Sequence, residues 1–289
     1  MTPTLFQLVV AARERFVRAG IPPDLAAIDA EVLARHLLAW DRATYLLRRD
    51  EPVSAADRAR YDALVERRAR REPVAYITGR REFWGREFVV SPAVLVPRPE
   101  TEVLVEAVLT RLGDRSRPWR IADVGTGSGC LAVTLAAELP ASRVVATDIS
   151  VAALQVARTN AVRHGVDGRI LMVRTSLLTG IAGPFDVVVA NLPYIPRPCA
   201  EALSPDVRDY EPHEALFGQG EDGLDTIREL LVQTSSRLSA DGLLLLEFGF
   251  GQGDAMRAEL ARTPLRLIDV LRDLQGHERT LVAAAPLTA

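Results

Sequence analysis

Hydrophobic residues recur with two different spacings along this chain. From residue 4 to about residue 71 they follow helical periodicity, as at Leu5, Leu8 and Ala12. Pro22-Pro23-Asp24 begins a second helix, and Pro52-Val53-Ser54 precedes another. This first region is therefore predicted to be a small bundle of four or five helices.

From residue 100 onward, helical and strand-like segments alternate. The segments expected to be helices cover residues 103–112, 130–139, 151–164 and 224–238, with another helix from residue 252. The segments expected to be strands cover residues 120–124, 144–147, 170–174, 185–190 and 243–248, with two more near 265–270 and 280–284. This alternation predicts an α/β fold, a doubly wound Rossmann-like sheet with helices on both faces.

The segment between these two regions has a different character. Residues 76–79, 82–85 and 88–90 suggest a short hairpin, and prolines at 92, 97 and 99 interrupt the chain after it. We therefore expect an N-terminal helical domain at residues 1–72, a hairpin linker at 73–99 and the sheet domain at 100–289.

Charge and composition exclude several classes of function. The formal net charge is −3, which argues against a dedicated nucleic-acid binder. All 35 positively charged residues are arginine, since the chain contains no lysine. The chain therefore has neither a Schiff-base lysine for pyridoxal phosphate nor the lysine of a Walker A motif.

Cysteine and histidine are too scattered to suggest a metal site. The two cysteines are Cys130 and Cys199, and the four histidines do not show metal-ligand spacing. We expect a reduced, cytoplasmic, monomeric protein without a bound metal. The N-terminus does not resemble a signal peptide, and no segment approaches the ~20 apolar residues that a membrane helix needs.

A glycine-rich loop follows the first expected strand of the sheet. The segment 123–129 reads Asp-Val-Gly-Thr-Gly-Ser-Gly, in which glycines allow sharp turns and close approach to a ligand. The dinucleotide fingerprint needs another glycine at position 130, where this chain has Cys130. The spacing matches instead the first motif of S-adenosylmethionine-dependent methyltransferases. The expected cofactor-binding residues in this loop are Gly125, Thr126, Gly127, Ser128 and Gly129.

Two more strand ends add to the expected cofactor site. Asp148 ends the second strand, where a carboxylate can accept hydrogen bonds from both ribose hydroxyls. Its alternative role is capping the helix that begins near Ser150. After the third strand, Ser176 lies where an acid is expected to meet the adenine amino group, and Leu177 lies where an apolar residue packs on the adenine. Because serine carries no charge, we expect that contact to be weaker.

The tetrapeptide Asn191-Leu192-Pro193-Tyr194 follows the apolar strand at 185–190. It places an amide oxygen, backbone carbonyls and an aromatic ring in the crevice where open α/β sheets bind ligands. The tetrapeptide resembles the (Asn/Asp)-x-Pro-(Tyr/Phe) signature of methyltransferases that act on conjugated amino groups. The alternative is an ordinary turn, because Asn and Pro are common turn residues.

With these motifs, the chain resembles the PrmC/HemK family, the glutamine methyltransferases of peptide chain release factors. The resemblance runs from about residue 5 to residue 284. Its most specific part is the Pro-Arg-Pro-Glu-Thr-Glu block at 97–102, and further matches lie at 71–79, 82–85, 206–216 and 222–224. The family usually has proline at position 192.

The resemblance implies a class I methyltransferase that makes N5-methylglutamine in the Gly-Gly-Gln loop of bacterial release factors. It implies that Asn191 accepts one amide hydrogen and that the Leu192 carbonyl accepts the other. Asn191 is also expected to contribute to the cofactor site. Pro193 would fix that carbonyl, and Tyr194 would pack on the amide plane. Residues 1–72 would recognise the release factor.

Three alternatives remain open at this point. The first is an N6-adenine methyltransferase acting on RNA or DNA, which should present a strongly basic cleft. The second is a flavin- or nicotinamide-dependent oxidoreductase, which Cys130 disfavours. The third is a binding module without turnover, which an intact Asn191 tetrapeptide disfavours.

Overall fold

The computed structural model describes residues 2–286, which fall into two compact units. One unit contains the residues up to 80 together with 204–210, and the other contains 81–203 together with the residues from 211 onward. These two units are defined by which residues pack together. The boundaries expected from the sequence, at residues 72 and 99, separate segments by their expected functions, and they stay predictions.

Five helices from the first 80 residues belong to the first unit, and the periodicity predicted the first four of them. They are α1 (Leu5–Arg18), α2 (Pro23–Leu38), α3 (Arg42–Arg48), α4 (Ala55–Ala69) and α5 (Val74–Thr78). Thr4 starts α1 with a capping box, and the Ser54 hydroxyl caps α4 by accepting from the Asp57 backbone N–H. The apolar faces of these helices meet in a core that includes the fully buried Phe16 and Leu33.

The short helix α9 (Pro205–Tyr210) packs with this first unit although it comes late in the chain. The buried Arg68 guanidinium lies between two carboxylates, donating to Asp29 and to Asp206 of α9 at 2.7 Å each. A buried cation is tolerated when its charge and its N–H groups are both satisfied. These ion pairs therefore anchor α9 on the helical unit.

The hairpin is shorter than the sequence suggested. It consists of β1 (Arg80–Phe83) and β2 (Arg86–Val89), joined by Trp84 and Gly85, both with positive φ. The preceding residues 74–78 form α5 instead of strand, because Pro73 presets a helical start and Gly79 ends the turn in the left-handed region.

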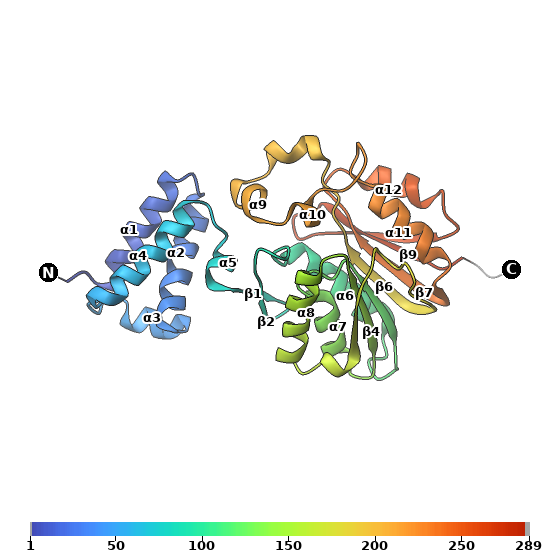
Figure 1. The fold of residues 1–289 in the computed structure, drawn as a ribbon, viewed down its shortest axis with the longest axis horizontal. Coiled ribbons are helices and arrows are strands. Elements are labelled where there is room, and N and C mark those ends of the chain that lie inside the picture. The colour runs from blue at the N-terminus through green and yellow to red at the C-terminus, as the bar shows by residue number, and fades with distance from the viewer. Residues whose placement is uncertain (1, 287–289) are drawn as a thin grey trace. The chain divides into compact units, whose positions relative to one another are not determined.

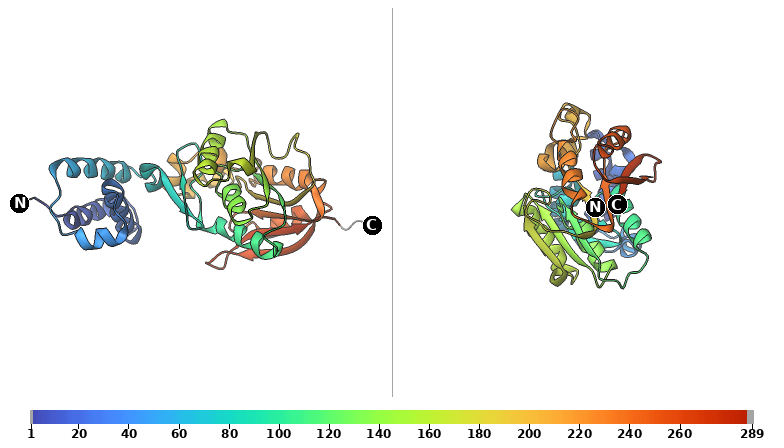
Figure 2. Two further views of the ribbon diagram at one scale, coloured as in Figure 1. Left: turned by 90° about the horizontal axis from the view of Figure 1, so that it is seen from below. Right: turned by 90° about the vertical axis from the view of Figure 1, so that its right-hand side faces the viewer.

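The second unit is built on a seven-stranded sheet with strand order β5-β4-β3-β6-β7-β9-β8. Strands β3 to β7 are parallel, whereas β9 is antiparallel to both its neighbours; β8 and β9 are drawn in red at one edge in Figure 2. The strands are β3 (Arg120–Val124), β4 (Arg143–Asp148), β5 (Ile170–Arg174), β6 (Phe185–Asn191), β7 (Leu238–Glu247), β8 (Arg266–Arg272) and β9 (Glu278–Ala284). The expected doubly wound α/β fold is thus confirmed.

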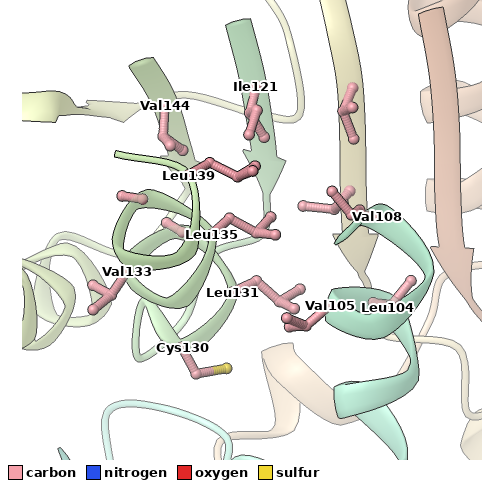
Figure 3. Packing of buried hydrophobic residues seen from close by; sticks show 14 of the residues in the cluster. Leu104, Val105, Val108, Ile121, Cys130, Leu131, Val133, Leu135, Leu139 and Val144 are labelled. Carbon is pink, nitrogen blue, oxygen red and sulfur yellow. The ribbon is translucent and has the colours of Figure 1, made fainter. Parts of the chain in front are cut away.

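Helices cover both faces of this sheet (Figure 1). On one face lie α6 (Glu102–Leu112), α7 (Cys130–Glu138) and α8 (Val151–Arg163), and on the other lie α11 (Asp225–Ser235) and α12 (Gly253–Leu260). Figure 3 shows Leu135 of α7 and Leu139, which follows α7, pointing toward the sheet, where Ile121 lies, and Leu131 lying beside Val105 of α6. Because neighbouring strand residues point to opposite faces, the central strands contribute to both cores, as Ile121 and Ala122 of β3 do.

The remaining short elements connect these layers. They are η1 (Pro99–Thr101), η2 (Asp167–Arg169), η3 (Arg197–Ala202) and α10 (His213–Leu216). Within residues 2–286, no helix is both long enough and apolar enough to cross a membrane.

The chain order of the strands fixes where a ligand can bind. After β3 the chain moves outward to β4 and β5, then returns to place β6 on the other side of β3. The loops after β3 and β6 therefore diverge at their carboxyl ends and leave a crevice between them.

Candidate active site

A cavity of about 490 Å³ lies at this crevice and is formed entirely by the sheet unit. Its volume falls in the range typical of small-molecule sites. Most of the site residues expected from the sequence line it: Gly125, Thr126, Gly127, Ser128, Asp148, Ser176, Leu177, Asn191, Leu192 and Pro193. Gly129 and Tyr194 do not contribute to its walls, and their expected contacts stay predictions.

The glycine loop is held by the end of the neighbouring strand. The backbone N–H groups of Gly125 and Thr126 both donate to the Thr147 carbonyl, each at 2.9 Å. Gly125 has φ +72°, and a Cβ there would lie 2.8 Å from Cδ2 of Leu192. Glycine is thus required at 125 both for its conformation and for its contact with the Asn191 tetrapeptide.

Asp123 supports the loop from below. Its buried carboxylate accepts from the Thr126 hydroxyl at 2.6 Å and from the Ala132 backbone N–H at 3.0 Å, so it ties the loop to the start of α7. Burial raises the pKa of Asp123 to about 6. Gly129 begins α7 in the left-handed region, and a Cβ there would lie 3.0 Å from the Cβ of Ala157. Gly129 therefore permits close approach of α7 and α8.

Asp148 lies at the carboxyl end of β4, facing the glycine loop. One carboxylate oxygen accepts from the Gly127 backbone N–H at 2.9 Å, and the other accepts from the Ser150 N–H at 2.8 Å. Ser150, not Asp148, is the cap of α8, because its side chain accepts from the Ala153 N–H. A carboxylate has about four acceptor positions, so each oxygen can still accept from a ligand hydroxyl. Burial raises the pKa of Asp148 above its usual value.

Ser176 and Leu177 follow β5 and line the same cavity. Leu177 is buried and has φ +50°, an uncommon conformation for a non-glycine residue. The exposed Ser176 side chain offers a hydroxyl but no charge at this end of the cavity.

Asn191 is the last residue of β6 and lies opposite Glu247, the last residue of β7. The Asn191 side-chain NH₂ donates to the Thr101 hydroxyl at 3.0 Å, and that hydroxyl donates to Glu247 at 2.7 Å. The Tyr194 hydroxyl donates to the other Glu247 oxygen at 3.4 Å. The Tyr194 backbone carbonyl accepts from the Gln252 side chain at 2.9 Å. Side chains from three other elements therefore hold the tetrapeptide.

The residues of this supporting network were absent from the expected site. Thr101 belongs to the Pro-Arg-Pro-Glu-Thr-Glu block, and Glu247 ends an expected strand. The sequence offered one sign of this network: the acidic residue Glu247 lies near the end of the apolar strand expected at 243–248, at a position where an ionisable side chain would be buried. The pairing of Thr101 with Glu247, 146 residues away, could not be read from the sequence.

Further wall residues come from the segments on either side of the cavity. The Arg98 side chain pairs with buried Glu211, which also accepts from the Val96 backbone N–H at 3.3 Å. On the opposite segment, His213 meets the Phe217 ring edge-on, with ring centroids 5.3 Å apart. Arg98, His213 and Phe217 all line the cavity.

These features define the class of protein. A glycine loop after β3, a carboxylate ending β4 and an Asn-Leu-Pro-Tyr tetrapeptide that starts at the end of β6, all on one doubly wound sheet, characterise a class I S-adenosylmethionine-dependent methyltransferase.

Comparison with known proteins then identifies the family. The family model described as PrmC N-terminal domain matches residues 7–79, and the model described as Ribosomal protein L11 methyltransferase (PrmA) matches residues 100–201. A release factor glutamine methyltransferase of Koribacter versatilis is 42% identical over 285 residues, covering 98% of this chain and 99% of the relative. The chain therefore belongs to the release factor glutamine methyltransferase family, as its sequence motifs predicted.

Solved structures agree with this fold. A ribosomal protein L11 methylase from Lactobacillus delbrueckii subsp. bulgaricus is 26% identical, with TM-score 0.50, over 65% of this chain and 80% of that one. A 16S rRNA N2 G1207 methyltransferase from T. thermophilus, solved with AdoMet and guanosine, shares the fold at 18% identity and TM-score 0.52, covering 71% of this chain and 49% of that one.

Proposed function

We propose that this enzyme transfers a methyl group from S-adenosylmethionine to the side-chain amide nitrogen of the glutamine in the Gly-Gly-Gln motif of peptide chain release factors. The product is N5-methylglutamine. One observation carries the proposal: Asn191, Leu192 and Pro193 share a single cavity with the glycine loop and Asp148. A methyl donor and an amide acceptor can therefore be held next to each other.

The cofactor side of the cavity fits S-adenosylmethionine. When bound, this cofactor supplies a methyl group on a sulfonium centre, which is already a strong electrophile. The residues 125–129 bring backbone close to it, and Asp148 retains lone pairs for the ribose hydroxyls. Leu177 offers an apolar surface, and Ser176 a hydroxyl, for the adenine.

The acceptor side of the cavity, at Asn191 and the residues after it, must align an amide nitrogen, which is a poor nucleophile. A carboxamide nitrogen shares its lone pair with the carbonyl group, so the site needs alignment and acceptors more than a strong base. We assign the Asn191 oxygen and the Leu192 carbonyl to the two amide hydrogens. Pro193 restrains the preceding backbone and so the direction of that carbonyl. Tyr194 is assigned to the face of the amide, and Gln252 fixes its backbone.

We assign recognition of the protein substrate to residues 1–72. Several large apolar side chains are exposed on these helices, among them Leu25, Ile28 and Leu47. Exposed apolar residues of this kind suit a protein partner. The proposal includes a monomeric enzyme that acts in the cytoplasm and does not bind nucleic acid stably.

The test is incubation with methyl-labelled S-adenosylmethionine and a purified release factor, followed by mass mapping of the modified residue. One methyl group on the glutamine of Gly-Gly-Gln is the expected result. Parallel reactions with RNA and with DNA test the adenine alternative, for which the net charge of −3 offers no support. Label in adenine and none in the release factor would overturn the proposal.

A further inference from the structure

Three side chains form a continuous hydrogen-bonded network at the acceptor side of the cavity. Asn191 and Thr101 both line the cavity, where Asn191 donates to Thr101, and Thr101 donates to Glu247 behind them. Thr101 and Glu247 are each 2% exposed, so water does not compete for these bonds. Parallel register places Asn191 and Glu247 side by side on β6 and β7, and Thr101 closes the chain from η1.

The number of protons on these three side chains decides which group donates in each hydrogen bond. An ionised glutamate only accepts, and threonine has one hydroxyl proton to donate. Thr101 therefore donates to Glu247, which leaves only lone pairs on Thr101 facing Asn191. Only the NH₂ group of Asn191 can bond to those lone pairs. The Asn191 amide oxygen must then point away from Thr101.

We propose that Glu247, acting through Thr101, fixes the orientation of the Asn191 amide so that its oxygen is presented to the acceptor. Glu247 and Thr101 are positioning residues, whereas Asn191 contacts the substrate. This inference rests on the proposed function, because it explains how the acceptor amide meets an oxygen and not an NH₂ group. An asparagine without this restraint could present either end of its amide at similar cost.

The surroundings of Glu247 bear on its ionisation. The charged or titratable groups that face it are Glu100, Cys130, Tyr194 and Arg279. Burial raises the pKa of Glu247 to about 7, while the Thr101 hydrogen bond and the charge of Arg279 oppose that rise. Once protonated, Glu247 can donate to Thr101, which frees the Thr101 proton for the Asn191 oxygen. Protonation therefore permits the opposite orientation of the amide.

Single-turnover methylation of a purified release factor tests the role of Thr101. Thr101→Val should lower the rate on the order of 10- to 100-fold, less than the loss of a group at the reacting atoms, with S-adenosylmethionine affinity unchanged. Thr101→Ser keeps the hydroxyl and should restore most of the rate. The matched control is Thr134→Val, because Thr134 is a buried threonine of α7 whose hydroxyl has no hydrogen-bond partner among the described residues. This control should methylate at the wild-type rate.

Variants that reverse the hydrogen bonds between residues 191, 101 and 247 test the direction of those bonds. In Asn191→Asp the new carboxylate faces Thr101 lone pairs, because Thr101 still donates to Glu247. Adding Glu247→Gln supplies an NH₂ group that can donate to Thr101, which can then donate to Asp at 191. The double variant should therefore be at least about fivefold faster than Asn191→Asp alone, the worth of one hydrogen bond.

The pH profile gives a readout that a purely structural role would not change. The wild-type single-turnover rate should rise as the pH passes through about 7, and Glu247→Gln should abolish that rise. A wild-type rate in Thr101→Val, or a double variant no faster than Asn191→Asp, would overturn this inference. Failure of the wild-type enzyme to methylate the release factor glutamine would instead overturn the proposed function. If Thr101→Val does not fold, the comparison of Asn191→Asp with the double variant and the pH profile still decide.

Discussion

The two sides of the cavity are built by different means. The cofactor side is made of backbone: Gly125 and Thr126 donate to the Thr147 carbonyl, and Gly127 donates to Asp148. The acceptor side is held by side chains, since Thr101 and Glu247 restrain Asn191 from elements distant in the sequence. Glycine backbone lets the cofactor approach closely, whereas an amide acceptor needs two acceptors aimed in set directions.

This difference leads to a separation of effects. Changes on the cofactor side should alter S-adenosylmethionine affinity, and changes on the acceptor side should alter kcat. The two sides meet where the Leu192 side chain lies close to Gly125. We expect the separation to fail there.

The largest effect is expected for Asn191→Ala. The substitution removes an oxygen that meets the nucleophile, and loss of one preorganised partner typically costs ~10²–10³ in rate. S-adenosylmethionine affinity, measured by calorimetry, should stay close to the wild-type value. Wild-type turnover of the release factor by this variant would remove Asn191 from the site.

Asp148→Ala should show the opposite pattern. The ribose hydroxyls lose a charged acceptor, and because such bonds contribute ~1.5–3 kcal/mol, affinity should fall roughly ten- to several hundred-fold. At saturating cofactor, kcat should be nearly unchanged. The Gly127 N–H also loses its partner, so the melting temperature should be compared with that of the wild type. Unchanged affinity in a folded variant would contradict the ribose assignment.

The same difference explains how far the sequence could predict the structure. The glycine loop and Asp148 follow strands with clear apolar patterns, and local backbone geometry decides their positions. Strand β3 begins and ends where the pattern placed it. The Thr101–Glu247 contact depends on tertiary packing, which no local pattern records. The helical turn α5 was missed because Pro73 and Gly79 at its two ends outweighed the β-branched and aromatic residues between them.

Gly125→Ala tests the contact between Gly125 and Leu192, where the two sides meet. A Cβ at 125 would lie 2.8 Å from Leu192, and φ +72° is strained for alanine at a cost of about 1–3 kcal/mol. Both cofactor affinity and kcat should fall, each by roughly five- to 100-fold, because Leu192 must shift.

The matched control is Gly127→Ala. Gly127 also has positive φ, but its Cβ would lie no closer than 4.0 Å to a neighbouring atom. Gly127→Ala introduces backbone strain without a clash with Leu192. This variant should therefore lower S-adenosylmethionine affinity while leaving kcat nearly unchanged. Equal effects of the two variants on kcat would show that the Leu192 contact does not couple the two sides.

The smallest effect is expected for Ser176→Asp, which should strengthen the cofactor side. Ser176 is exposed at the cavity edge, so a carboxylate there keeps most of its hydration and loses little on being introduced. A hydrogen bond from the adenine amino group to a carboxylate is stronger than one to a hydroxyl by about 1 kcal/mol, which predicts roughly fivefold tighter binding. Calorimetry at low and high salt should show the gain shrinking as salt increases, since the added interaction is electrostatic.

Ser176→Ala serves as the control and should bind S-adenosylmethionine a few-fold more weakly than the wild type. Because Ser176 follows β5, which β4 and β3 separate from the Asn191 strand β6, kcat at saturating cofactor should not change in either variant. Weaker binding by Ser176→Asp would mean that the new charge meets Asp148 more closely than it meets the adenine, and that the adenine lies elsewhere in the cavity.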